Sequence, residues 1–113
     1  MWQGGINMRY DMIEALSKKT GIKPIVLHEI IKLAQCNNVE KVILFGSRAR
    51  GDFKERSDID LAFYGGFSSQ FILSVDEETS TLLEFDIVDL KKPVQSKLLE
   101  SIEQEGIVIY EKI

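Results

Sequence analysis

The sequence predicts an α/β or α+β fold in which helices pack against a mixed sheet of about four strands. Apolar residues recur at helical spacing in some segments, whereas other segments are short β-branched or aromatic runs. The two kinds of segment are interleaved, and no internal repeat or linker divides the chain. Because 113 residues is the length of one ordinary domain, we expect a single domain with one hydrophobic core over residues 1–113.

Two helices are expected in the N-terminal part of the chain. Residues 1–8 contain glycines but no periodic pattern, so we expect them to form a loose end. Residues 9–20 carry apolar side chains at helical spacing and are followed by Gly21, a common C-terminal stop. Pro24 suits the first turn of a second helix, which we expect to end before Asn37.

Four segments have the character of strands. Residues 41–45 are almost continuously apolar and stop at a glycine, which indicates a buried central strand. Residues 57–64 alternate carboxylates with aliphatic side chains, so one face of this strand is core and the other is charged. Residues 84–90 and 106–110 complete the set, and residues 93–104 between them have the pattern of a helix.

The segment 68–83 is ambiguous. Phe71, Val75 and Leu82 stand at helical spacing, but the run from Phe71 to Leu73 has the character of a strand. The spacing over the whole segment favours a helix.

The bulk properties exclude several classes of protein. A net charge of −4 argues against broad binding to nucleic acid, although a local basic patch can still hold a phosphate. No apolar run approaches the roughly 20 residues that span a bilayer, and the first residues do not resemble a signal peptide. The single Cys36 is expected to remain a thiol in a reducing compartment. We therefore expect a cytoplasmic protein.

Asp58 and Asp60 are the first candidates for chemistry. Two acids separated by one residue on a strand point the same way and lie about 7 Å apart. Such a pair repels itself unless a cation neutralises it, and a hard divalent ion with oxygen ligands does this well. Magnesium keeps few protein ligands and completes its coordination with water and phosphate oxygens. The pair therefore predicts a magnesium site with a phosphate-bearing substrate.

A third carboxylate would allow two ions to be bridged. Asp86 is the best placed, because a strand next to 57–64 can bring it beside the first two acids on the same face. Asp89 is the alternative, but it lies an odd number of residues away and faces the opposite side of a regular strand.

The loop between the first two predicted strands is a candidate phosphate site. Gly46 permits close approach of the backbone, and Ser47 offers a hydroxyl and an amide at the start of a short helix. Arg50 lies inside the turn and is the favoured phosphate contact. Arg48 and Arg56 are equally well explained as surface charges paired with Asp52 or Glu55 and as contacts with phosphate.

These features together identify a family resemblance. The segment VILFGSRARGDFKERSDIDLAF resembles the signature of the DNA polymerase beta nucleotidyltransferase superfamily, in which a GS pair, ten intervening residues and a DxD follow one another. The resemblance runs over residues 39–90 and looks specifically like the minimal nucleotidyltransferases of prokaryotes. It implies a nucleotidyltransferase core in which Asp58, Asp60 and Asp86 are the catalytic residues and also the ligands of two Mg²⁺ ions. Gly46 and Ser47 would bind the triphosphate of ATP.

The resemblance also implies an activity and a partner. Minimal nucleotidyltransferases are typically encoded beside a helical HEPN-domain protein, and such pairs act as toxin and antitoxin. The expected reaction attaches AMP to a tyrosine hydroxyl of the HEPN toxin with release of pyrophosphate. Two alternatives stay open, namely transfer to a small hydroxylated molecule such as an aminoglycoside and a module that neutralises a partner by binding alone.

Overall fold

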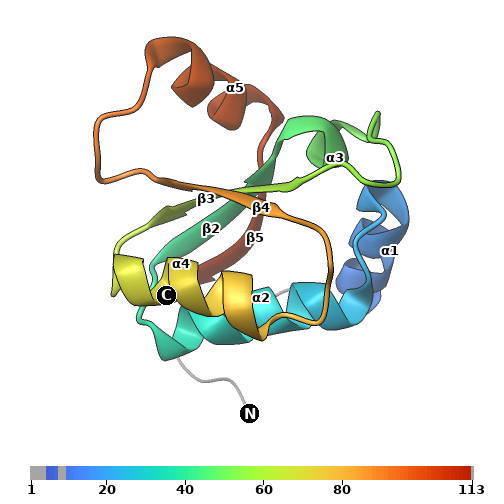
Figure 1. Ribbon diagram of the computed structural model, residues 1–113, viewed down its shortest axis with the longest axis horizontal. Coiled ribbons are helices and arrows are strands. Elements are labelled where there is room, and N and C mark those ends of the chain that lie inside the picture. Colours follow the sequence, from blue (N-terminus) through green and yellow to red (C-terminus); the bar gives the residue numbers. More distant parts are fainter. Residues whose placement is uncertain (1–4, 8–9, 113) are drawn as a thin grey trace.

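The chain forms a mixed sheet with helices on both of its faces (Figure 1). A computed structural model describes residues 5–7 and 10–112, with side chains from residue 12 onward. The elements in chain order are β1 (Gly5–Asn7), α1 (Tyr10–Thr20), α2 (Pro24–Cys36), β2 (Lys41–Phe45), α3 (Gly46–Arg50), β3 (Ile59–Tyr64), α4 (Ser68–Glu78), β4 (Phe85–Asp89), α5 (Ser96–Glu105) and β5 (Ile107–Lys112).

The strand order is β1-β5-β2-β3-β4, and only the β3–β4 pair is parallel. The four predicted strands and the fold class are therefore confirmed, and a fifth strand is added. The prediction of a loose N-terminal end is wrong for Gly5–Asn7, because these residues pair with β5. The pairing is made by backbone hydrogen bonds, so the side-chain pattern does not reveal it. Residues 1–4 and 8 lie outside the described part of the chain.

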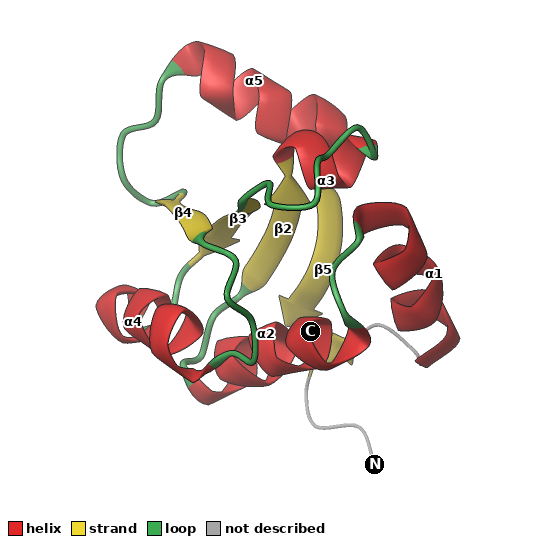
Figure 2. Cartoon of the chain, turned by 45° about the vertical axis from the view of Figure 1, so that its right-hand side comes forward, coloured by secondary structure: helices red, strands yellow, loops and turns green. Residues whose placement is uncertain are grey.

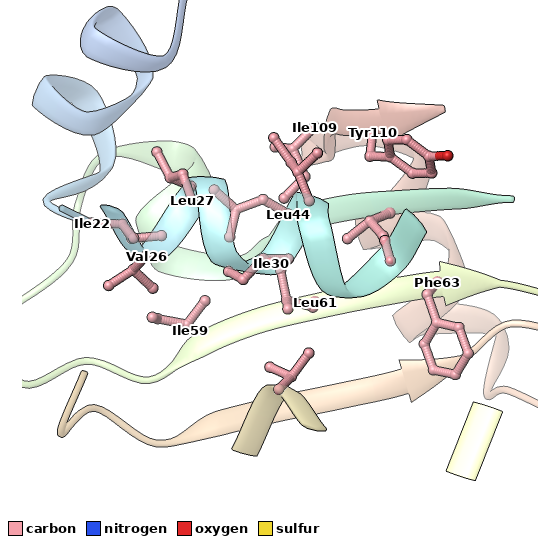
Figure 3. Packing of buried hydrophobic residues seen from close by; sticks show 14 of the residues in the cluster. Ile22, Val26, Leu27, Ile30, Leu44, Ile59, Leu61, Phe63, Ile109 and Tyr110 are labelled. Atoms are coloured by element: carbon pink, nitrogen blue, oxygen red, sulfur yellow. The ribbon is translucent and has the colours of Figure 1, made fainter. Parts of the chain in front are cut away.

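The main core lies on one face of the sheet, under α1, α2 and α4 (Figure 3). Alternate residues of β2 and β3 point into it, as the period of a strand requires. Phe63 meets Phe71 of α4 edge to face, with 5.0 Å between ring centroids, and this contact fixes α4 on the sheet. Fully buried members of this core include Ile13, Val26, Leu27, Ile30, Leu44, Ile59, Leu61 and Ile109.

The opposite face of the sheet carries a smaller apolar cluster of Phe45, Ala62 and Ile102 under α5. Figure 2 shows α3 and α5 together on this side, away from α2 and α4. Asp60 belongs to the same face, since it lies between Ile59 and Leu61 of the main core. The acidic face of β3 is therefore continuous with the apolar surface that α5 partly covers.

Two predicted helix boundaries differ from the structure by three residues or more. Helix α4 ends at Glu78, where Thr79 turns to an extended conformation and Ser80 donates to Glu29 of α2. Leu82 therefore lies outside the helix and is fully exposed. Helix α5 begins three residues later than Pro93, because Asp89 accepts hydrogen bonds from the amides that follow it and holds a turn there. Within the described ranges, no helix is long and apolar enough to cross a membrane.

Candidate active site

The register of the parallel pair brings two acids together. Asp60 of β3 lies opposite Asp86 of β4, while Asp89 lies opposite the buried Phe63. Asp58 stands just before β3 and is exposed, as is Asp86, whereas Asp60 is half-buried. The structure thus places Asp58, Asp60 and Asp86 at one end of the sheet and leaves Asp89 on the other side of β4.

The electrostatics of this end centre on Asp60. Its pKa is raised from 3.8 to about 6, first by partial burial and then by the negative charges of Asp86 and Asp58. Arg50 and Arg48 oppose this shift but do not cancel it. Negative charge is therefore concentrated around Asp60, and a bound cation would relieve this repulsion.

The raised pKa predicts an unusual dependence of stability on pH. A carboxyl whose pKa is higher in the folded chain stabilises the fold below pH 4, and this contribution is lost as the pH rises through about 6. In the metal-free protein, Asp60→Asn is therefore expected to increase the free energy of unfolding at pH 7.5 by about 1 to 2 kcal/mol, a value reduced from the full shift because Asp60 is half-exposed to solvent.

Urea denaturation at pH 7.5 and pH 4 would measure this effect. The gain should vanish near pH 4, and Asp76→Asn, an exposed acid on α4, should show no comparable change between the two pH values. An equal gain for Asp60→Asn at both pH values would contradict the assignment of a repelled carboxylate.

The glycine of the GS pair touches the acidic strand. Gly46 has a φ of +77°, and a Cβ built on it would lie 2.1 Å from Oδ2 of Asp60. Only a residue without a side chain can occupy this position, because the conformation and the space both exclude one. The loop expected to hold a triphosphate therefore lies directly against Asp60, one of the acids expected to hold magnesium.

Ser47 follows in α3, which is a single short helix. Its carbonyl accepts the amides of Gly51 and Asp52 at 2.9 and 3.1 Å, which closes the turn. A helix this short has a small dipole, so the chemically useful groups of the turn are its backbone amides and the Ser47 hydroxyl. Both can donate hydrogen bonds to phosphate oxygens.

The arginines of this loop have separate environments. Arg50 is exposed and forms ion pairs with Asp52 at 3.2 Å and with Glu105 of α5 at 2.9 Å. Arg48 is only 1% exposed, so the interpretation of Arg48 as a surface charge is wrong. Arg56 is exposed and lines a hollow of about 500 Å³ beside Asp58.

The comparison with known proteins decides what this arrangement is. The family described as Polymerase beta, Nucleotidyltransferase, matches residues 28–113, which include α3 and all three acids. The chain belongs to this nucleotidyltransferase family. A Methanocaldococcus jannaschii protein described as a candidate protein adenylyltransferase is 29% identical to it, over 84% of this chain and 100% of that protein.

Solved structures share the fold of this nucleotidyltransferase. A toxin–antitoxin structure with AMP-PNP has a TM-score of 0.58 and 23% identity. A toxin–antitoxin structure of MntA–HpeT has a TM-score of 0.61 and 21% identity. Each similarity covers 76% of this chain and 73% of the other chain.

The donor chemistry of the nucleotidyltransferase suits magnesium bound together with a nucleotide. Carboxylate oxygens are the protein ligands that this ion prefers, and Asp60 and Asp86 present them from adjacent strands. Among the described residues, no three acids, histidines or cysteines are gathered into a ready-made metal cage. Magnesium completes its coordination with water and phosphate oxygens, so these two acids fit an ion bound together with a nucleotide.

Two contacts of the nucleotidyltransferase site were missed by sequence reasoning. Glu105, the partner of Arg50, is the last residue of α5 and lies 55 positions away in sequence. Arg48 is anchored to residues of α1 and of the loop before β3. No local pattern relates Glu105 to Arg50. Arg48 directly follows the GS pair and has small neighbours, a context in which a buried arginine could have been predicted.

Proposed function

We propose that this nucleotidyltransferase transfers AMP from ATP, with Mg²⁺, to a hydroxyl of a helical HEPN-domain protein and so acts as an antitoxin. The observation that carries the proposal is the contact of Gly46 with Asp60, opposite Asp86, because it joins a phosphate loop to a set of acids. The name of the Methanocaldococcus jannaschii relative supports a protein acceptor. The toxin–antitoxin structures that share the fold agree with a toxin as that acceptor.

In this proposal, Gly46, Ser47 and Arg50 bind the triphosphate. The backbone at Gly46 approaches the phosphates closely, and Ser47 donates from its amide and hydroxyl. Arg50 now pairs with Asp52 and Glu105, both partly solvated, and exposed ion pairs contribute little to stability. A triphosphate offers the guanidinium more negative charge and a bidentate partner, so Arg50 can exchange these carboxylates for phosphate oxygens.

The reaction is a displacement at the α-phosphorus. The acceptor oxygen forms a bond to this phosphorus, the bond to the bridging oxygen breaks, and pyrophosphate leaves with that electron pair. Asp86 is exposed on the edge strand β4, and we assign it the acceptance of the hydroxyl proton. Bound Mg²⁺ would neutralise the charge that develops on the entering and leaving oxygens.

An exposed apolar surface under α5 suits a protein partner. The same face of the sheet carries an apolar hollow of about 510 Å³ under α5, at the opposite end of β3 from Asp60, and its lining includes Tyr64, Leu99 and Val108. These side chains are 43%, 39% and 42% exposed. An open apolar surface of this kind is typical of a site that binds another protein.

The test is the intact mass of a HEPN-domain protein, the proposed partner, after incubation with this chain, ATP and Mg²⁺. A gain of one or more AMP units supports the proposal. A complex without any mass gain would favour neutralisation by binding alone. Pyrophosphate release that requires a small hydroxylated molecule, with no gain on the protein, would favour small-molecule transfer.

A further inference from the structure

Arg48 is a buried cation that the proposed reaction does not use. It is 1% exposed and is the largest of the fully buried side chains in the described part of the chain. Its Nε donates to the carbonyl of Ser57 at 2.9 Å, Nη1 to that of Thr20 at 2.9 Å and Nη2 to that of Glu55 at 3.1 Å. The guanidinium also stacks on the ring of Phe53, 4.8 Å from its centroid.

Burial of a guanidinium is costly unless its donors are satisfied and its charge is stabilised. Here burial lowers the pKa of Arg48, and the negative charges of Asp58 and Asp60 act in the opposite direction. Charge-assisted hydrogen bonds from three nitrogens and the aromatic face offset much of the remaining cost. A planar fork with fixed donor directions makes such a set of bonds, which a lysine ammonium cannot reproduce.

The three carbonyls belong to segments that meet at the active site. Thr20 ends α1, while Glu55 and Ser57 belong to the loop that leads into β3. Ser57 directly precedes Asp58, and Arg48 directly follows Ser47. The side chain of Arg48, which follows the proposed phosphate-binding Ser47, is therefore bonded to the residue that precedes Asp58.

The other bonds of the loop are local: the amides of Gly51 and Asp52 donate to the carbonyl of Ser47, and Asp52 pairs with Arg50. The amide of Lys54 donates to the Ser57 side chain at 2.8 Å, and the amide of Ser57 donates to the carbonyl of Lys54 at 3.0 Å, so these bonds close the loop on itself. Arg48 links it to α1 and α3. Asp58 itself is exposed and lies outside the regular hydrogen bonds of β3.

We infer that Arg48 is a positioning residue: it holds the 51–58 loop so that Asp58 stands beside Asp60 at a fixed distance from the Ser47 turn. This inference rests on the proposed function, because it concerns the acids that the reaction uses. It assigns no contact with nucleotide to Arg48, whose donors are already engaged by carbonyls. By holding the loop, Arg48 affects how readily the acids and the nucleotide bind magnesium together.

The experiment measures the Mg²⁺ concentration that half-saturates binding of AMP-PNP to the full chain, by titration calorimetry. The variants are Arg48→Lys, which keeps the charge but loses the fork, and Phe53→Leu, which removes the ring under the guanidinium. The control is Val75→Ala, a core substitution in α4 that destabilises the fold without touching the loop.

Arg48→Lys is expected to raise the required Mg²⁺ concentration about tenfold, because the loop loses its bonds to the guanidinium. Phe53→Leu is expected to raise it about threefold, because only the ring under the guanidinium is lost. Val75→Ala should leave it unchanged. An unchanged Mg²⁺ requirement in a folded Arg48→Lys protein would overturn the inference. If Arg48→Lys does not fold, Phe53→Leu decides, since its side chain is only partly buried.

The failure of the proposed function has a different signature. If the unaltered chain binds no AMP-PNP at any Mg²⁺ concentration, the proposed function is overturned along with the inference that rests on it. If the unaltered chain binds AMP-PNP with Mg²⁺ and both loop variants match it, only the role of Arg48 is overturned.

Discussion

Asp60→Asn is expected to lower the rate of nucleotidyl transfer at least about 100-fold while the protein becomes more stable at pH 7.5 without metal. The two effects have one cause, which is the concentration of negative charge around Asp60. Activity needs this charge because it attracts the ion that neutralises the phosphates. In the metal-free protein the same charge destabilises the fold by repulsion. Asparagine removes both the attraction for the ion and the repulsion.

The measurement is the initial rate of AMP transfer, at saturating ATP and Mg²⁺, beside the melting temperature of each variant. Asp86→Asn should lose activity to a similar extent, because it faces Asp60 across the parallel pair. Asp89→Asn is the matched control on the same strand, since Asp89 faces the other side and bonds the Lys91 amide. Loss of activity in Asp89→Asn with retention in Asp86→Asn would show that the assignment of the third acid is wrong.

Gly46→Ala is expected to remove nucleotide binding and to lower the free energy of unfolding by about 2 to 4 kcal/mol. The new Cβ would meet Oδ2 of Asp60 at 2.1 Å, so the turn, the carboxylate or both must move. A displacement of about 1 Å in an active site can cost about 100-fold in rate. The positive φ adds a separate conformational cost.

Gly51→Ala separates these two causes. Gly51 also has a positive φ, of +91°, but a Cβ there would find its nearest neighbour, the carbonyl of Lys19, at 3.9 Å. This variant should lose about 1 kcal/mol of stability from conformation alone and keep its affinity for AMP-PNP within about threefold. Chemical denaturation and calorimetry of the two variants would measure both quantities. Equal losses of nucleotide affinity would mean that conformation, rather than contact with Asp60, makes Gly46 necessary.

The sequence by itself determined the elements and the chemical groups of the site. The alternation around Asp60 fixed which face of β3 is core, because a one-residue change of register would bury the acids and expose Ile59 and Leu61. The GS pair and the spaced acids identified the family before any tertiary contact was known, since these residue types follow from the chemistry of phosphate and magnesium.

Only the tertiary structure decided how these groups meet. Backbone pairing gave β1 its place in the sheet, and the β3–β4 register put Asp86, and not Asp89, opposite Asp60. The burial of Arg48 depends on carbonyls from α1 and from the loop before β3, which no local pattern relates to one another. Side-chain periodicity records which face of an element is buried, whereas main-chain hydrogen bonds between distant segments leave no mark on the residues that accept them.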